Sequence, residues 1–306
     1  MLDTVTPVKI SVFANLFNAV LDPILIFSFA MGVPGAAVAT LAAEVISAVT
    51  YLSLMRRRQM IRFRKIFSIP SWEKLEPLIK GGAALQLRNF ALNLTFLAVT
   101  RVTQSIDNTG VAAAAHALAI QTFQVGGIVL LALSTVAQIV VPGELVEKYD
   151  EETGRTVGGS YAAKAVVKRL MSWSLLMGIV LAGFQLAVLP ALHMATPMME
   201  VRETARIPSY LASLYQVFNG MVFVGEGVMI GCGNYMQLSM STVVATAGCL
   251  WALKILPGKY GLAGVWLGFG VFNGLRLLGV ILHQTTTGPL AKRNLRKALK
   301  SAEKKG

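Results

Sequence analysis

Long apolar segments dominate the pattern of this chain, and each is long enough to form a helix across a membrane. A hydrocarbon core of ~30 Å requires about 20 apolar residues in a helix. The segments lack the alternation over about ten residues that is typical of a membrane β-barrel. They are rich in Gly, Ala, Ser and Thr, as packed membrane helices are. The pattern predicts an all-α, polytopic membrane bundle of about eight spans, near 8–31, 35–55, 79–101, 111–141, 169–194, 208–232, 236–256 and 262–283.

Composition and charge support a membrane protein. Of the 306 residues, 55% are hydrophobic and 14% are charged, against about 25% charged in soluble domains. The net charge of +13 comes mainly from three clusters: 56–80, the 143–169 connection and the tail from Lys292 to Lys305. This positive-inside bias places those segments and both termini on the cytosolic side. We therefore interpret the basic runs as topology signals and contacts with membrane lipids, and expect no nucleic-acid partner.

Other sequence signals exclude several classes of site. The two cysteines, Cys232 and Cys249, imply neither a disulfide framework nor a metal site. No P-loop and no catalytic cluster is present, so we expect neither direct ATP hydrolysis nor an enzyme. The first residues lack the basic region of a signal peptide.

The spans are unevenly distributed. Two precede a basic connector and six follow it, with external connections expected near 102–110, 195–207 and 257–261. The connector contains a helix N-cap at Ser71 and suits a short interfacial helix with Phe63, Phe67 and Trp72 at headgroup level. Transporters are commonly built from two like halves. We therefore expect further helices before residue 1 in the complete protein.

Two acids lie inside apolar segments, Asp22 and Glu226. An ionised carboxylate in hydrocarbon requires a partner, a proton or a water-filled cavity. Asp22 precedes Pro23, which removes a backbone donor and interrupts the helical ladder. Both acids are therefore candidates for binding a proton or cation.

Five stretches of sequence, in order along the chain, carry a resemblance to a known family. They are NLFNAVLDPILIF at 15–27, GVPGAAVAT at 32–40, AAHALAIQT at 114–122, FVGEGVMIG at 223–231 and GLAGVWLG at 261–268. In this order they resemble the fifth, sixth, eighth, tenth and twelfth helices of the MATE (multidrug and toxic compound extrusion) family. Ala117 departs from the pattern, since the family usually has Gln there.

This resemblance implies a domain organisation. A complete MATE protein has twelve helices in two lobes, so helices one to four would be absent here, through a truncated gene model or a functional short form. Residues 1–55 would end the N-lobe, 56–79 form a basic cytosolic connector, 80–285 the six-helix C-lobe and 286–306 a basic tail.

Within the family, Asn18 and Asp22 match an Asn-x-x-x-Asp pair of DinF-like, proton-coupled members. The run LSTVAQ at 133–138, followed by VPGE, is similar to the plant plastid-envelope branch that includes the salicylic acid exporter.

The resemblance also suggests roles for polar residues in the spans. Asp22, Asn18 and Glu226 are the candidates for coupling to a proton or cation. The alternatives are a capped kink for Asp22, an interhelical hydrogen bond for Asn18, and a charge pair of Glu226 with Arg88 or Arg276. Candidates for lining a substrate cavity are Arg88, Gln121, Gln138, Gln216, Asn219 and His116. Each of these could instead bond between helices, and Arg88 could bind an organic anion.

We expect a secondary antiporter that exports a small organic solute, such as a xenobiotic, an organic cation or anion, or a phenolic metabolite, in exchange for H⁺ or Na⁺. It would need no cofactor, act as a monomer and lie in the plastid envelope, the plasma membrane or the vacuolar membrane. The alternatives are a lipid-linked oligosaccharide flippase of the same superfamily, a truncated fragment without transport activity and a membrane-embedded enzyme.

Overall fold

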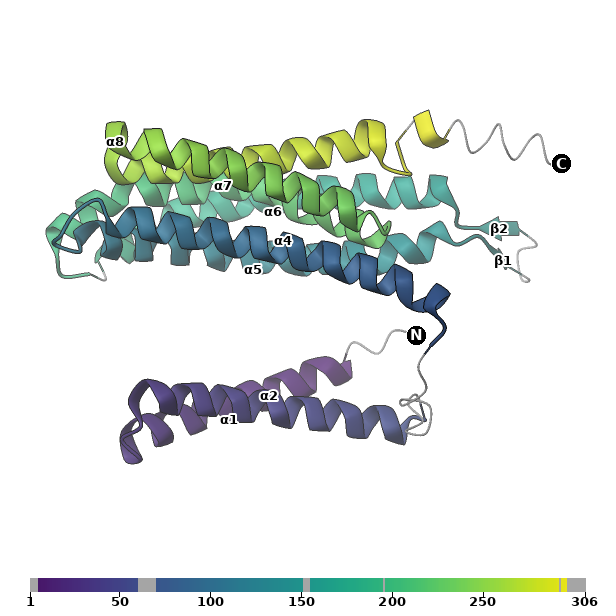
Figure 1. Ribbon diagram of the computed structural model, residues 1–306, viewed down its shortest axis with the longest axis horizontal. Helices are drawn as coiled ribbons and strands as arrows, with labels where there is room; N and C mark the ends of the chain where they lie inside the picture. Colours follow the sequence, from purple (N-terminus) through teal and green to yellow (C-terminus); the bar gives the residue numbers. More distant parts are fainter. Residues whose placement is uncertain (1–4, 60–69, 151–154, 195, 292, 296–306) are drawn as a thin grey trace. The chain divides into compact units, whose positions relative to one another are not determined.

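The computed structural model describes residues 5–59, 70–150, 155–194, 196–291 and 293–295. The chain forms two compact units, residues 1–75 and 76–306, and each is described by itself. In the described residues nearly all regular structure is helical (Figure 1). The prediction of an all-α helix bundle is therefore confirmed.

The first unit is a pair of helices joined by a tight turn. Helix α1 (Val5–Pro23) continues into a π-helical turn (Ile24–Ser28) and is followed by α2 (Gly32–Arg57). The π-turn begins directly after Pro23, whose missing N–H cannot serve the ordinary helical ladder. Small residues let the helices approach: a Cβ on Gly35 would lie 2.9 Å from the Leu25 carbonyl carbon.

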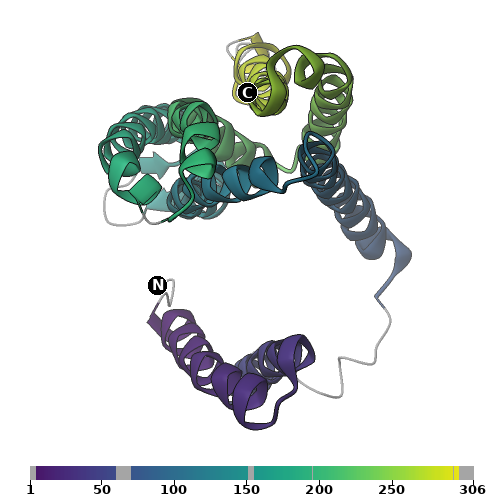
Figure 2. The same ribbon diagram turned by 90° about the vertical axis from the view of Figure 1, so that its left-hand side faces the viewer.

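The second unit is a bundle of long helices that run side by side (Figure 1, Figure 2). They are α4 (Trp72–Gln104), α5 (Val111–Leu145), α6 (Ser160–Met194), α7 (Met199–Gly231) and α8 (Tyr235–Leu282), which ends in a π-helical turn (His283–Thr287). Helix α7 contacts α5, α6 and α8, so it is the central element. At Gly261 the backbone of α8 leaves the helical region, with φ of +54°, and this break divides α8 into the last two predicted spans.

Several predicted boundaries were wrong. The 195–207 connection is much shorter, because α7 begins at Met199. The 257–261 connection reduces to the single non-helical residue Gly261. The internal connection holds a short antiparallel hairpin, β1 (Lys148–Asp150) and β2 (Arg155–Val157), which the sequence did not predict. Helix α4 begins directly after Ser71, whereas the proposed interfacial helix with Phe63 and Phe67 lies outside the described residues.

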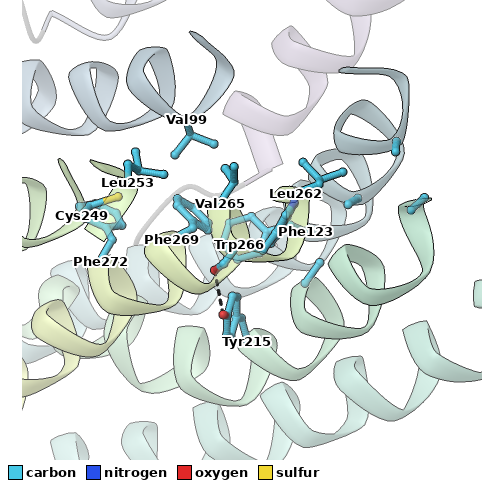
Figure 3. Packing of buried hydrophobic residues seen from close by; sticks show 14 of the residues in the cluster. Val99, Phe123, Tyr215, Cys249, Leu253, Leu262, Val265, Trp266, Phe269 and Phe272 are labelled. Carbon is cyan, nitrogen blue, oxygen red and sulfur yellow. Dashed lines mark hydrogen bonds between the residues drawn. The ribbon is translucent and has the colours of Figure 1, made fainter. Parts of the chain in front are cut away.

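An aromatic cluster forms the core of the second unit (Figure 3). Phe123 and Phe269 pack edge-to-face with centroids 5.0 Å apart, and the Tyr215 hydroxyl donates to the Trp266 carbonyl at 2.9 Å. Lipid tails are as apolar as this core, so close packing and hydrogen bonds, rather than burial from water, hold such helices together. Over the described residues, five helices combine the length and hydropathy needed to cross a membrane: α1 with its π-turn, α2, α5, α6 and α8.

Candidate functional site

A buried cluster of three charged side chains joins α4, α7 and α8. Arg276 of α8 donates from Nε to Oε1 of Glu226 at 2.7 Å and from Nη2 to Oε2 at 2.9 Å. Arg88 of α4 donates from Nη2 to the same Oε2 at 2.5 Å. The side chains of Glu226, Arg276 and Arg88 are 4%, 6% and 17% exposed. We call these three residues the Arg–Glu–Arg cluster.

Two glycines allow Glu226 to reach this position. A Cβ on Gly227 would lie 2.5 Å from the Ser134 carbonyl oxygen of α5, and one on Gly225 would overlap the Val280 side chain of α8. Any larger residue would push α7 away from both helices. The sequence FVGEGVMIG therefore places an acid where three helices lie close together.

Neighbouring residues hydrogen-bond to, or pack against, most of the Arg276 guanidinium group. Its Nη1 donates to Oδ1 of Asn273 at 3.4 Å, and its Cζ lies 5.6 Å and 5.1 Å from the ring centres of Phe223 and Phe272. Arg276 is therefore held by an acid, an amide and two aromatic faces. Arg88 has fewer partners, and its Nε is buried without a hydrogen-bond acceptor.

The cluster carries an unequal number of charges, two positive and one negative. Within the described residues, no other acid forms an ion pair with either arginine. The structure thus contains the charge pair that was the alternative interpretation of Glu226, and a coupling role for Glu226 stays a prediction. A net positive charge buried in a helix bundle is costly unless an anion or water accompanies it.

Two glutamines from different helices bind consecutive carbonyl groups of α5. Gln185 of α6 donates to the Thr122 carbonyl at 2.8 Å, and Gln216 of α7 donates to the Phe123 carbonyl at 2.9 Å. Gln216 is fully buried, so in this structure it bonds between helices. Asn219, also fully buried, donates to Oε1 of Gln216 at 3.5 Å.

The other cavity candidates lie apart from one another on α5. Gln121 is exposed and lines a pocket of about 280 Å³ formed with α6 and α7. Gln138 is half-buried and donates to the Ser134 hydroxyl at 3.5 Å, within its own helix. His116 is buried, with its ring 5.7 Å from that of Trp266, and its Nδ1 has no hydrogen-bond partner. Their assignment to a substrate cavity stays a prediction.

Asp22 and Asn18 lie one turn apart on α1, in the first unit. Both are half-buried, and Oδ1 of each is a buried atom without a hydrogen-bond partner. Their coupling role also stays a prediction.

The sequence reasoning missed Glu44, an acid in the middle of α2, and the buried amide Gln185. The same signal, a polar residue within an apolar segment, marks both.

Comparison with known proteins agrees with this architecture. No family model matches the chain. It is 28% identical over 291 residues to Protein DETOXIFICATION 44, chloroplastic, of Arabidopsis thaliana, covering 94% of this chain and 52% of that protein. It is 24% identical to a probable multidrug resistance protein NorM of Thermotoga maritima, covering 87% and 56%. A solved MATE structure in a bent conformation superposes with a TM-score of 0.76 at 18% identity, covering 95% of this chain and 63% of that one.

The resemblance to the MATE family is confirmed. A crystal structure of a mutant of the Vibrio cholerae MATE transporter VcmN has the same fold, with a TM-score of 0.74 at 19% identity, covering 97% of this chain and 63% of that one. Together with the apolar helices, this fold makes the chain a multi-pass membrane protein. The expectation of a protein that is not an enzyme agrees with the MATE resemblance. The chain spans about half the length of the curated relatives that it matches.

Proposed function

We propose that this chain is part of a secondary antiporter that exports small organic solutes in exchange for H⁺ or Na⁺. The observation that carries the proposal is the Arg–Glu–Arg cluster inside a helix bundle of MATE fold. Ionisable groups within membrane spans are costly and mark substrate or ion pathways. The names of the relatives, which include multidrug resistance proteins, support transport of organic solutes.

The proposed organisation follows the MATE resemblance. Residues 1–55 form the end of the N-lobe, 80–285 form the C-lobe, and the basic segments 56–79 and 286–306 lie on the cytosolic side. We propose a monomer that requires no cofactor, with the plastid envelope as its membrane because two relatives are named chloroplastic.

Coupling is assigned to Asp22, with Asn18 as its neighbour one turn away. The buried Oδ1 of Asp22 has no partner, so a proton or cation would find an unsatisfied acceptor there. The π-helical turn after Pro23 supplies an irregular backbone that can change when this acceptor is filled. Glu226 remains the second coupling candidate, and in this structure it pairs with Arg276 and Arg88.

Flux across proteoliposomes tests the proposal. The chain is reconstituted and loaded with radiolabelled benzenesulfonate or benzyltrimethylammonium, whose charges do not change with pH, and a pH or sodium gradient is imposed. We expect gradient-driven efflux of one probe, which Asp22→Asn abolishes. Glu200→Gln, which changes an exposed acid at the start of α7, is the matched control.

Two results would contradict the proposal in different ways. Absence of gradient-dependent flux for both probes in the unmodified chain would reject antiport by this chain. Equal flux in Asp22→Asn and the unmodified chain would reject Asp22 as the coupling group while antiport stands.

A further inference from the structure

The positive charge of the Arg–Glu–Arg cluster that remains uncompensated resides on Arg88. Arg276 and Glu226 share two hydrogen bonds, at 2.7 Å and 2.9 Å, and form a neutral pair. Asn273, Phe223 and Phe272 surround the rest of the Arg276 guanidinium, so little of it is accessible to a ligand.

Arg88 is differently placed. It lies midway along α4, donates one hydrogen bond to Glu226 and keeps a buried Nε without an acceptor. Its side chain is 17% exposed, against 6% for Arg276. Among the described residues, the only acid that Arg88 contacts is Glu226, and Glu226 already pairs with Arg276. The charge of Arg88 therefore lacks a counter-charge of its own inside the bundle.

We propose that Arg88 is the binding group for an oxyanion (a carboxylate, sulfonate or phosphate) of an organic solute. This assignment deepens the proposed transport function and rests on it for its physiological meaning. A planar guanidinium binds such groups through paired, charge-assisted hydrogen bonds. The ligand supplies the missing negative charge, while Glu226 stays with Arg276. A cationic solute at the same place would meet a cluster that is already positive.

A groove of about 600 Å³ opens at the end of the second unit that the charge pattern assigns to the cytosol, and its lining ends one residue before Arg88 on α4. It lies between α4 and the start of α8 and is lined by Lys80, Gly81, Ala84, Leu87 and Tyr235, among others. Arg88 follows Ala84 by four residues and therefore lies on the same face of α4, one turn further along. The groove is mostly apolar, so it suits the organic body of an anion whose charged group reaches Arg88.

Equilibrium binding without any gradient tests the site separately from transport. Radiolabelled benzenesulfonate is titrated onto the purified chain in detergent, with neutral benzenesulfonamide and cationic benzyltrimethylammonium as comparison probes. We expect saturable binding of the sulfonate alone. Arg88→Gln should weaken it roughly tenfold or more, and Arg88→Lys, which keeps the charge but loses the planar fork, by less. Arg101→Gln, an exposed arginine on the same helix about 20 Å away, should leave it unchanged.

Each outcome decides between the two proposals. Equal affinity in Arg88→Gln, preference for the cation, or no saturable sulfonate binding by the folded chain would overturn the oxyanion site. Sulfonate binding that depends on Arg88 without gradient-driven flux would retain the site and reject antiport. If Arg88→Gln fails to fold, thermal unfolding of the unmodified chain decides: benzenesulfonate must raise the Tm and benzenesulfonamide must not.

Discussion

Gln216 fills the space that Gly126 leaves open. A Cβ on Gly126 would lie 2.5 Å from Cδ of Gln216, whose Nε2 donates to the neighbouring Phe123 carbonyl. The missing side chain on α5 and the buried amide on α7 therefore form one contact. This contact ties together α5 and α7, which share the most extensive helix–helix contact among the described residues.

We expect Gly126→Ala to destabilise the chain by about 1–3 kcal/mol, because the new methyl group displaces a buried hydrogen-bond donor. The double variant Gly126→Ala/Gln216→Ala should lose less free energy of unfolding than the two single variants together, because the new methyl group no longer collides with the Gln216 side chain. Gly127→Ala is the control, since the nearest atom to its Cβ, Cζ of Phe223, lies at 3.9 Å. Denaturant unfolding in detergent is measured for the unmodified chain and for the four variants. Additive costs would contradict the contact.

A second close approach lies between α6 and α7. A Cβ on Gly178 would lie 2.5 Å from the Gln216 carbonyl oxygen, whereas nothing lies within 4 Å of one on Gly183 in the same helix. Gly178→Ala should therefore lower the Tm. Gly183→Ala should leave it unchanged or raise it, because alanine favours a helix by up to about 1 kcal/mol over glycine. Equal Tm changes in the two variants would disprove this packing.

The turn before α5 depends on Asp107. Its carboxylate accepts hydrogen bonds from the backbone N–H groups of Ala112, Gly110 and Thr109 at 2.7–3.0 Å. The bond from Ala112 is the largest contribution to a pKa of Asp107 below its ordinary 3.8. Stability from a lowered pKa is complete above the unfolded-state value and is lost as the pH falls through the folded-state value.

We therefore expect Asp107→Ala to lower the Tm at pH 7 and to differ less from the unmodified chain at pH 3. Thermal unfolding of both proteins at the two pH values measures the change. Asp107→Asn, which keeps an acceptor but cannot ionise, is the control and should lower the Tm less than Asp107→Ala at pH 7. A difference between Asp107→Ala and the unmodified chain that is the same at both pH values would refute the role of the ionised carboxylate.

The helices could be predicted from sequence because a membrane requires each span to satisfy its own backbone within a long apolar run. Their ends were less predictable. Helix α7 begins at Met199, well before the predicted 208, because polar residues such as Glu200 and Arg202 continue a helix beyond the apolar segment. The break in α8 falls within the predicted 257–261 connection, but the apolar pattern did not show that it reduces to one residue, Gly261, with a positive φ.

The partners of the polar residues were harder to predict. The sequence marked Glu226 as an acid that needs a counter-charge, and both Arg88 and Arg276 as candidates. Only the packing of three helices shows that it meets both, and that Arg276 has two bonds to it where Arg88 has one. Such a difference depends on side-chain geometry across segments far apart in sequence.

The free energies of unfolding of three single variants test the central claim, that Glu226 pairs with Arg276 and leaves the charge of Arg88 uncompensated. Glu226→Gln, which leaves two buried cations, and Arg276→Gln, which breaks the neutral pair, should each cost about 3–5 kcal/mol. Arg88→Gln leaves the Glu226–Arg276 pair intact and should stay within about 1 kcal/mol of the unmodified chain or stabilise it. A loss in Arg88→Gln as large as that in Arg276→Gln would contradict the claim.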